Sequence, residues 1–382
     1  GCGETPYAKL LTQLFGPRMY IANATGCSSI WGGSAPGIPY TKNEKGQGPA
    51  WANSLFEDNA EYGYGMYLAQ DTMRRRLIKE AEALVENIEA PHEKEALEGY
   101  LSTLEDGDRN LAATDTLIEV LSKSLDPRAQ QLLHHKQFLS KKSNWILGGD
   151  GWAYDIGFGG LDHVLTTGAD VNVLVFDTEV YSNTGGQMSK ATPTGAVAQF
   201  AAGGKEGTKK DLAYMMMTYG SVYVAQVALG ADFNQTLKAF REAESYPGPS
   251  LIIAYSPCIN HGIRGGMVNA DLEMKKAVEC GYWNLFRYDP RRKAAGQNPF
   301  QMDSKTPTGD YQAFLKNEVR YSALMRAYPE RAHRLFDRAE VNAVGRHERL
   351  LQWEALSGKL VTAEAEEQQR EAESRRAEAE KQ

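Results

Sequence analysis

The sequence predicts an α/β protein built on a mostly parallel sheet with helices on both faces, plus a helical insertion and a helical C-terminal tail. Two observations indicate this fold class. Short apolar strands alternate with helical stretches over residues 143–285, and near-continuous apolar strands occur where both faces of a parallel sheet are covered. Leu and Ala also recur at helical spacing among charged residues over 66–142, which is typical of amphipathic helices.

The first part of the chain, residues 1–65, has Gly, Pro, Ser and Asn between short apolar segments. It predicts a helix over 6–15, a strand over 19–23 and a long loop over 25–49. A loop of this length inside a compact domain is usually functional or disordered. Its aromatic and glycine residues, such as Trp31, favour an ordered loop around a ligand.

Residues 143–285, the third part of the chain, are expected to form one α/β domain together with residues 1–65. Residues 66–142, the second part, are expected to form the helical insertion between them. Strands are expected over 145–147, 171–176, 222–229 and 251–255, and helices over 158–167, 231–245 and 270–280. Ligands of such sheets bind outside the carboxyl ends of the strands. The loops after Leu147, Phe176 and Tyr255 are therefore the candidates for a functional site.

The last part of the chain is predicted to be a C-terminal extension over 286–345 and a charged tail over 346–382. The extension starts as a connector rich in Pro, Lys and Gly over 289–308 and continues as helices. The tail is rich in Glu and poor in large apolar residues, a composition typical of a solvated helix or a disordered linker.

Composition limits the function classes. With 382 residues the chain has the length of two or three domains. Lys and Arg number 42 against 49 Asp and Glu, a net charge of -7, which argues against a general nucleic-acid-binding surface. The sequence shows no apolar run that suits a membrane span and no charged-then-apolar leader. We therefore expect a protein that is not secreted and is cytoplasmic, or in an organelle matrix if it is eukaryotic. Because Gly1 is not preceded by Met, the chain is expected to be part of a longer protein.

The loop after the first strand of the third part contains Gly149, Asp150 and Gly151, and the loop after the second begins near Thr178. The 26 residues between Gly151 and Thr178 suit one helix and one strand, which would return Thr178 to the same edge of the sheet. The Asp150 carboxylate, the Thr178 hydroxyl and a nearby carbonyl could then hold Mg²⁺. A simple turn is the alternative for this triplet, whereas a dinucleotide fingerprint would need Gly at the position of Tyr154.

Four cysteines, at positions 2, 27, 258 and 280, are too few for a disulfide scaffold, so each is a buried thiol, a metal ligand or a redox centre. Cys2, Cys27 and Cys258 lie on loops that could share one sheet edge, although small buried thiols are common. Cys280 is expected inside a helix as a packing residue. His261 lies in a strand-end loop, where both a structural and a site role stay open.

Two other features have ordinary structural interpretations. The run from Met215 to Met217 is expected to pack as one helix face. His134 and His135 are expected on a solvated helix surface, because no Cys or carboxylate is placed to complete a metal site with them.

Six segments carry a resemblance to a known family. Residues 1–6, 26–33, 47–58, 148–163, 177–187 and 258–262 together closely resemble the carboxy-terminal thiamine-diphosphate domain of the pyruvate:ferredoxin (flavodoxin) oxidoreductase family. The match runs to about residue 335, and the tail beyond about 345 is outside it. The resemblance implies a thiamine-diphosphate-binding fold.

The resemblance also implies site residues. Mg²⁺ would be bound by Asp150, Thr178 and the Val180 carbonyl. Thiamine diphosphate would be lined by Glu4, Cys27, Gly149, Asp150, Gly151, Trp152, Thr178, Glu179, Val180, Tyr181, Ser182 and Asn183. Three ligands of a 4Fe-4S cluster would be Cys2, Cys27 and Cys258, and the fourth would lie three residues before Cys2. Asn183, five residues beyond Thr178, is the candidate catalytic residue, because its amide could donate to a bound oxoacid or to the thiamine.

The activity implied is oxidative decarboxylation of pyruvate with coenzyme A to acetyl-CoA and CO₂. Electrons would pass from the thiamine centre through the cluster to ferredoxin or flavodoxin, in a homodimer whose other domains are not in this chain. Three alternatives stay open: a pyruvate:NADP oxidoreductase with a fused flavin reductase module, a non-oxidative thiamine-dependent decarboxylase, and a catalytically silent interaction fragment.

Overall fold

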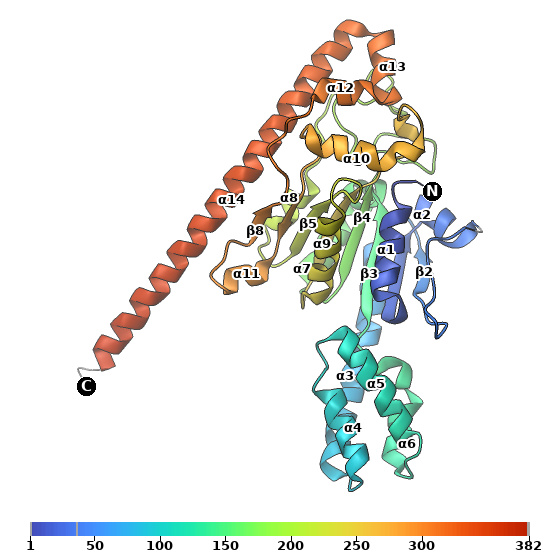
Figure 1. Ribbon diagram of the computed structural model, residues 1–382, viewed down its shortest axis with the longest axis vertical. Helices are drawn as coiled ribbons and strands as arrows, with labels where there is room; N and C mark the ends of the chain where they lie inside the picture. The colour runs from blue at the N-terminus through green and yellow to red at the C-terminus, as the bar shows by residue number, and fades with distance from the viewer. Residues whose placement is uncertain (1, 36, 380–382) are drawn as a thin grey trace.

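An eight-stranded sheet forms the centre of the protein in this computed structural model, which describes residues 2–35 and 37–379, with side chains through residue 362. The strands are β1 (Met19–Ala24), β2 (Ala50–Ser54), β3 (Ser143–Gly149), β4 (Asn172–Asp177), β5 (Tyr223–Val227), β6 (Ser250–Tyr255), β7 (Phe286–Tyr288) and β8 (Phe300–Met302). They lie in the order β2-β1-β3-β4-β6-β5-β7-β8. Strands β1 to β6 pair in parallel and the last two pair antiparallel (Figure 1). The predicted mostly parallel sheet is confirmed.

Helices cover the sheet. They are α1 (Thr5–Phe15), α2 (Cys27–Ser29), α3 (Asn59–Asn87), α4 (Pro91–Leu101), α5 (Gly107–Leu121), α6 (Pro127–His134), α7 (Phe158–Thr166), α8 (Leu212–Met217), α9 (Phe233–Ser245), α10 (Ala270–Glu279), α11 (Pro290–Ala294), α12 (Tyr311–Lys316), α13 (Val319–Ala327) and α14 (Pro329–Ala379). Every residue of β4 and β6 is buried. Side chains alternate between the two faces of a strand, so both faces of the sheet are covered.

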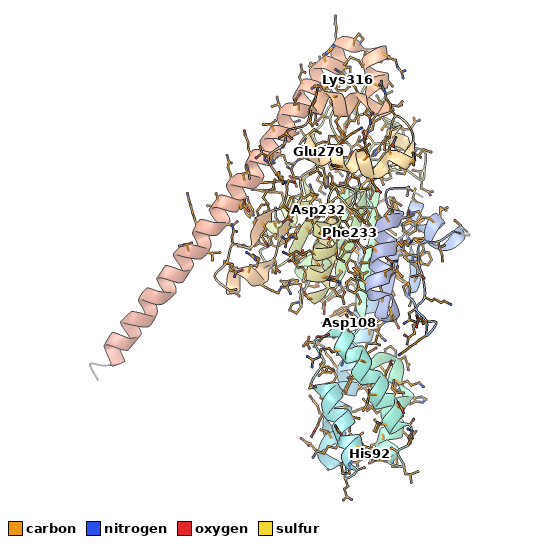
Figure 2. The ribbon with its side chains drawn as sticks, viewed as in Figure 1. His92, Asp108, Asp232, Phe233, Glu279 and Lys316 are labelled. Carbon is orange, nitrogen blue, oxygen red and sulfur yellow. The ribbon has the colours of Figure 1, made fainter. Side chains whose placement is uncertain are left out.

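Local sequence explains where the covering helices start. Pro6 lies in the first turn of α1, where its missing N–H removes no hydrogen bond, and Tyr7, Leu11 and Phe15 are buried on that helix. Helix α9 starts after Asp232, whose carboxylate accepts the backbone N–H of Gln235 at 2.9 Å. Figure 2 shows Asp232 beside the sheet.

The helices α3 to α6 form a cluster with its own hydrophobic core, below the sheet in Figure 1. The first turns of α3 pack on the sheet, since a Cβ at Gly63 would lie 2.5 Å from Ile146 Cγ1. The rest of α3 packs against its own cluster through Leu77 and Leu84. His92, on α4, lies at the far end of the cluster (Figure 2). The helical expectation for 66–142 is confirmed, except that α3 starts earlier; the domain boundaries stay a prediction.

The C-terminal part departs from the expectation in one respect. The predicted connector over 289–308 includes strand β8, and β7 precedes it, so the chain returns to the sheet instead of leaving it. Phe286 pairs with Met302, and β7 pairs antiparallel with β5 through Val224 and Tyr288. Three-residue strands are too short for a periodic pattern, which is why the sequence did not indicate them.

Helix α14 packs its first half on the sheet domain. Leu335, Phe336, Ala343 and Leu350 are buried, as is Val361, and the last turns of the helix extend away from the rest of the molecule (Figure 1). Within the part of the chain that the structure describes, no helix is long and apolar enough to cross a membrane.

Four neighbouring strands bring their carboxyl ends to one edge of the sheet. In the order β1-β3-β4-β6 all pairs are parallel, so the loops that start after Ala24, Gly149, Asp177 and Tyr255 lie on the same side. Loops at this edge are the usual ligand-binding positions of a parallel sheet.

Candidate functional site

A cavity of about 250 Å³ lies where the loops after β1, β3 and β4 meet. It is lined by Glu4, Thr25, Gly26, Cys27, Ser28, Phe56, Gly149, Asp150, Gly151, Thr178, Val180, Tyr181, Ser182, Asn183 and Thr184. The structure brings together all the predicted thiamine-lining residues except Trp152 and Glu179. The cavity depends on the parallel topology, because only neighbouring parallel strands deliver these loops to one edge.

The Thr178 hydroxyl lies within hydrogen-bond distance of three other oxygen atoms. Its Oγ1 lies 2.9 Å from Asp150 Oδ1 and 2.9 Å from the Val180 carbonyl oxygen. The Ser182 hydroxyl donates to Thr178 Oγ1 at 3.0 Å. A carboxylate, a hydroxyl and a carbonyl are the hard oxygen ligands that Mg²⁺ prefers.

Asp150 is a buried carboxyl without a cationic partner in hydrogen-bond contact. Burial, and then the neighbouring Asp177 carboxylate, raise the pKa of Asp150 to about 8, although hydroxyl donors at Ser189 and Thr178 act in the opposite direction. The Ser189 hydroxyl donates to Asp150 Oδ2 at 2.5 Å. A divalent cation at this carboxylate would favour its charged form, so the donor set fits a metal ligand.

Glu179 lies between Thr178 and Val180 but turns its side chain away from the cavity. Its φ of 60° is in the left-handed region, which is uncommon for a residue with a side chain. Arg320 Nη2 lies 2.8 Å from Glu179 Oε2, and Lys209 Nζ lies 2.9 Å from Oε1. Burial alone would raise the pKa of Glu179, but Lys209 and then Arg320 lower it to about 2. The charges of Lys209 and Arg320 keep the Glu179 carboxylate ionised and hold its backbone in the left-handed conformation.

Further ion pairs and hydrogen bonds hold Asp177 and the Thr178 backbone in place. Lys209 Nζ lies 2.8 Å from Asp177 Oδ2, and the Tyr154 hydroxyl donates to the same oxygen at 2.7 Å. His261 Nε2 lies 2.8 Å from the Thr178 carbonyl oxygen, and His261 is fully buried. His261 therefore contacts the backbone of the site from outside the cavity.

Glu4 closes the cavity on the side of the N-terminal segment. Its carboxylate accepts a hydrogen bond from Trp31 Nε1 at 2.6 Å. Burial raises the pKa of Glu4 to about 7, and the Trp31 hydrogen bond lowers it in part. Trp31 packs its ring edge-on against Phe176, at the end of β4, with a centroid distance of 5.7 Å. This contact fixes the loop that carries Cys27 next to the cavity.

Three of the four thiols lie close enough to affect one another. The backbone N–H of Gly3 donates to the Pro257 carbonyl at 3.0 Å, which places Cys2 beside the loop of Cys258. Burial, and then the Glu4 carboxylate, raise the pKa of Cys2 to about 11, and they raise that of Cys27 further. Negative charge on Cys258 would raise both. Of these three, only Cys27 lines the cavity.

No group of three or more His, Cys, Asp or Glu side chains within residues 2–35 and 37–379 is arranged to hold a metal ion. The oxygen donor set at Thr178 has a single side chain of these types, Asp150. The three thiols are neighbours without the geometry of a formed site.

Other predicted residues have different positions. Trp152 is fully buried under Gly148 and Gly157 and lies outside the cavity lining. Cys280 was expected inside a helix, but it directly follows the end of α10 as its C-cap. The physical reason is Gly281, whose positive φ of 77° ends the helical conformation. Cys280 is nevertheless buried, as a packing thiol would be.

Two further interpretations agree with the structure only in part. Met216 and Met217 are buried in α8, but Met215 is exposed and does not share their packed face. His134 is exposed at the end of α6, whereas His135 follows the helix as its C-cap and is half-buried.

The sequence interpretation missed several residues of the site. Thr25, Gly26 and Ser28 flank Cys27 and line the cavity, and their position directly after a strand could have indicated them. Ser189 bonds to Asp150 from 39 positions away in the sequence, and Arg320 bonds to Glu179 from 141 positions away. No local signal distinguishes such residues, because only the fold brings them near.

The chain is similar in sequence to a known domain family and to several known proteins. Residues 134–254 match the family of the C-terminal TPP-binding domain of thiamine pyrophosphate enzymes. The pyruvate:ferredoxin oxidoreductase of Moorella thermoacetica is 58% identical over 358 residues, 91% of this chain and 30% of that protein. The pyruvate-flavodoxin oxidoreductase of Enterobacter agglomerans is 58% identical over 353 residues, 90% of this chain and 30% of that protein.

A third relative has another electron acceptor in its name. The mitochondrial NADP(+)-linked pyruvate dehydrogenase of Euglena gracilis is 52% identical over 355 residues, which are 91% of this chain and 20% of that protein. The chain thus spans less than a third of the length of each of these relatives.

Proposed function

From the premise that this chain is homologous to one segment of the pyruvate:ferredoxin and pyruvate-flavodoxin oxidoreductases, we infer that it supplies the thiamine-diphosphate-binding part of an enzyme that oxidises pyruvate. The observation that carries this proposal is the cavity at the strand ends, where the Thr178 hydroxyl lies within hydrogen-bond distance of both the Asp150 carboxylate and the Val180 carbonyl. A thiamine pyrophosphate-binding domain with this donor set has the parts needed to hold a metal-bound diphosphate.

The residues of the cavity fit the cofactor in two respects. The Asp150 carboxylate has only the Thr178 and Ser189 hydroxyls as side-chain partners, so no cationic side chain competes with a metal for it. Gly26 and Gly149 border the cavity with open space, since a Cβ at Gly26 would meet nothing within 4 Å. Backbone amides can approach a phosphate closely at such positions.

Thiamine diphosphate, when bound, supplies the electron sink that the decarboxylation of a 2-oxoacid needs. This chain would bind Mg²⁺ through Asp150, Thr178 and the Val180 carbonyl. Asn183 would orient the oxoacid from the rim of the cavity, where its side chain is exposed. The buried carboxyl of Glu4, with its pKa of about 7, can hold a proton near neutral pH.

A 4Fe-4S cluster bound by Cys2, Cys27 and Cys258 is the proposed electron exit. Thiolate ligands form when a metal displaces the thiol protons, so the raised thiol pKa values do not exclude ligation. A cluster of this kind takes four cysteine ligands, so a fourth would be needed besides these three. Cys258 Sγ lies 3.2 Å from Ser182 Oγ, and Ser182 lines the cavity, which supports a short path from thiamine to cluster.

The remaining features of the whole enzyme are proposals of the same kind. Pyruvate and coenzyme A would be the substrates, ferredoxin or flavodoxin the acceptor, and a homodimer the assembly. The Euglena relative favours NADP⁺ as a second candidate for the final acceptor, because it matches this chain over nearly the same length.

The test is thiamine diphosphate binding by the full-length protein, measured by calorimetry at saturating Mg²⁺. Asp150→Asn removes a charged metal ligand and should weaken binding by at least about 10-fold, the lower limit seen for supporting residues of metal sites. The matched control is Asp162→Asn on α7, whose carboxylate accepts a hydrogen bond from Tyr219 outside the cavity. Equal affinities in the two variants would disprove the metal assignment.

A further inference from the structure

A second cavity, of about 260 Å³, lies on the other side of the Thr178–Val180 backbone, against helix α14. Its lining includes Glu179, Lys209 and Asp211, together with Asn342, Arg346 and Arg349 of α14. Glu179 is its nearest link to the thiamine cavity, but the two cavities share no lining residue. The second cavity is therefore a separate place for a ligand.

Two residues of helix α14 that line this cavity carry donors without a partner. Arg346 Nη2 donates to the Tyr282 carbonyl at 2.7 Å, whereas Arg346 Nε and Asn342 Nδ2 are buried and have no hydrogen-bond partner. A buried donor without a partner is destabilising. An acceptor bound in the cavity could therefore be stabilised by these residues.

The side chains that line the cavity include more cationic groups than carboxylates. Neither Arg346 nor Arg349 forms a salt bridge with any carboxylate of the described residues. Both Glu179 oxygens are already bound, by Lys209 on one side and by Arg320 and Tyr282 on the other. The Asp211 carboxylate accepts the backbone N–H of Tyr214 at the start of α8. The acids of the cavity are thus already hydrogen-bonded, while the two guanidinium groups have no carboxylate partner among the described residues.

We propose that this cavity binds a small oxyanion, namely the phosphate or carboxylate group of a small molecule, through Asn342, Arg346 and Arg349. These residues stand four and three positions apart, so they lie on one face of α14. A guanidinium presents paired N–H donors that match the oxygens of a phosphate or carboxylate. The volume is just below the usual range of small-molecule pockets, which suits a ligand little larger than the anion itself.

The test is equilibrium dialysis of the full-length protein with radiolabelled inorganic phosphate. Saturating thiamine diphosphate and Mg²⁺ are present so that the diphosphate site is already filled. Arg346→Met should weaken phosphate binding by roughly 10-fold or more, as expected for the loss of a charge-assisted hydrogen bond. Arg349→Met, an exposed position at the cavity, should act in the same direction and does not depend on repacking the helix.

The control is Arg338→Met, on the same helix and outside the lining, where the guanidinium lies 3.7 Å from Glu206. It should leave phosphate binding unchanged. Competition by acetate distinguishes the two ligand groups: displacement at comparable concentration assigns carboxylates to the cavity, and no displacement assigns phosphates. If phosphate and acetate both fail to bind, or if all three variants bind phosphate as the unchanged protein does, the proposal is wrong.

Discussion

Arg320 donates a hydrogen bond to Glu179 across 141 positions of the sequence, with Nη2 2.8 Å from Oε2 and both side chains buried. Glu179 is the residue between two proposed metal ligands, Thr178 and Val180, and its φ is 60°. Turning the Glu179 side chain toward Arg320 leaves the Thr178 hydroxyl and the Val180 carbonyl on the side of Asp150. The ion pair therefore positions the proposed metal-binding oxygens without touching the cavity.

Arg320→Met should destabilise the protein and weaken thiamine binding together. The change removes one buried partner of the Glu179 carboxylate, and one of the Glu318 carboxylate, which lies 2.6 Å from Arg320 Nε. Breaking a buried ion pair on one side costs about 3–5 kcal/mol. Urea unfolding measures the free energy, and calorimetry measures Mg²⁺-dependent thiamine affinity.

The control for this change is Arg331→Met, because Arg331 pairs with Glu206 at the surface. An exposed pair contributes about 0–1 kcal/mol, so the control should lose little. If Arg320→Met lowers stability and leaves thiamine affinity intact, the ion pair stabilises the fold but does not position the metal ligands.

Asn183→Ala should reduce turnover more than it reduces cofactor affinity. The Asn183 side chain lines the cavity and is exposed, so removing it disturbs little packing. Loss of a positioned donor to a reacting group typically lowers kcat by about 100-fold. Steady-state kinetics and thiamine calorimetry on the same preparation separate the two effects.

Asn87→Ala, at the end of α3 in the helical cluster, is a matched control and should change neither quantity. Equal losses of turnover and cofactor affinity in Asn183→Ala would instead assign Asn183 a structural role in the loop.

Cys258→Ser should remove the cluster signal of this domain, and Cys280→Ser should leave it intact. Cys258 belongs to the group of three neighbouring thiols, whereas Cys280 packs at the end of α10. Anaerobic reconstitution of the full-length protein, followed by iron analysis and electron paramagnetic resonance, measures the cluster. A complete signal after Cys258→Ser would remove the proposed electron exit and favour a non-oxidative thiamine enzyme.

Gly63→Ala should destabilise the packing of α3 on the sheet. The new Cβ would lie 2.5 Å from Ile146 Cγ1 and 3.1 Å from Ala22 Cβ, and overpacking of this kind costs about 1–3 kcal/mol. Gly65→Ala, two residues later on the same helix, would meet nothing within 4 Å and should stabilise by about 0.5–1 kcal/mol. Thermal or urea unfolding of the pair checks the difference, and equal stabilities would contradict the close approach of α3 to β3.

Much of the fold and part of the candidate site could be predicted from local sequence. The apolar runs of β3, β4 and β6 are continuous because both of their faces are buried, and that requirement is visible in the residues themselves. The interval between Asp150 and Thr178 suits one helix and one strand, and parallel strands return equivalent loops to one edge. The spacing therefore predicted that these two residues could meet at one edge, with a simple turn as the alternative, and Thr178 Oγ1 indeed lies 2.9 Å from Asp150 Oδ1.

Only the tertiary structure decided the contacts between segments that are far apart in the sequence. Strands β7 and β8 exist because β5 offers them an open edge, and three residues carry no periodic pattern of their own. The direction of the Glu179 side chain depends on Arg320 and Lys209, which approach it only after the sheet and α13 have packed. Local residue patterns encode burial and backbone preference, whereas the partner of a buried charge is chosen by contacts between segments far apart in the chain, and these form only in the folded protein.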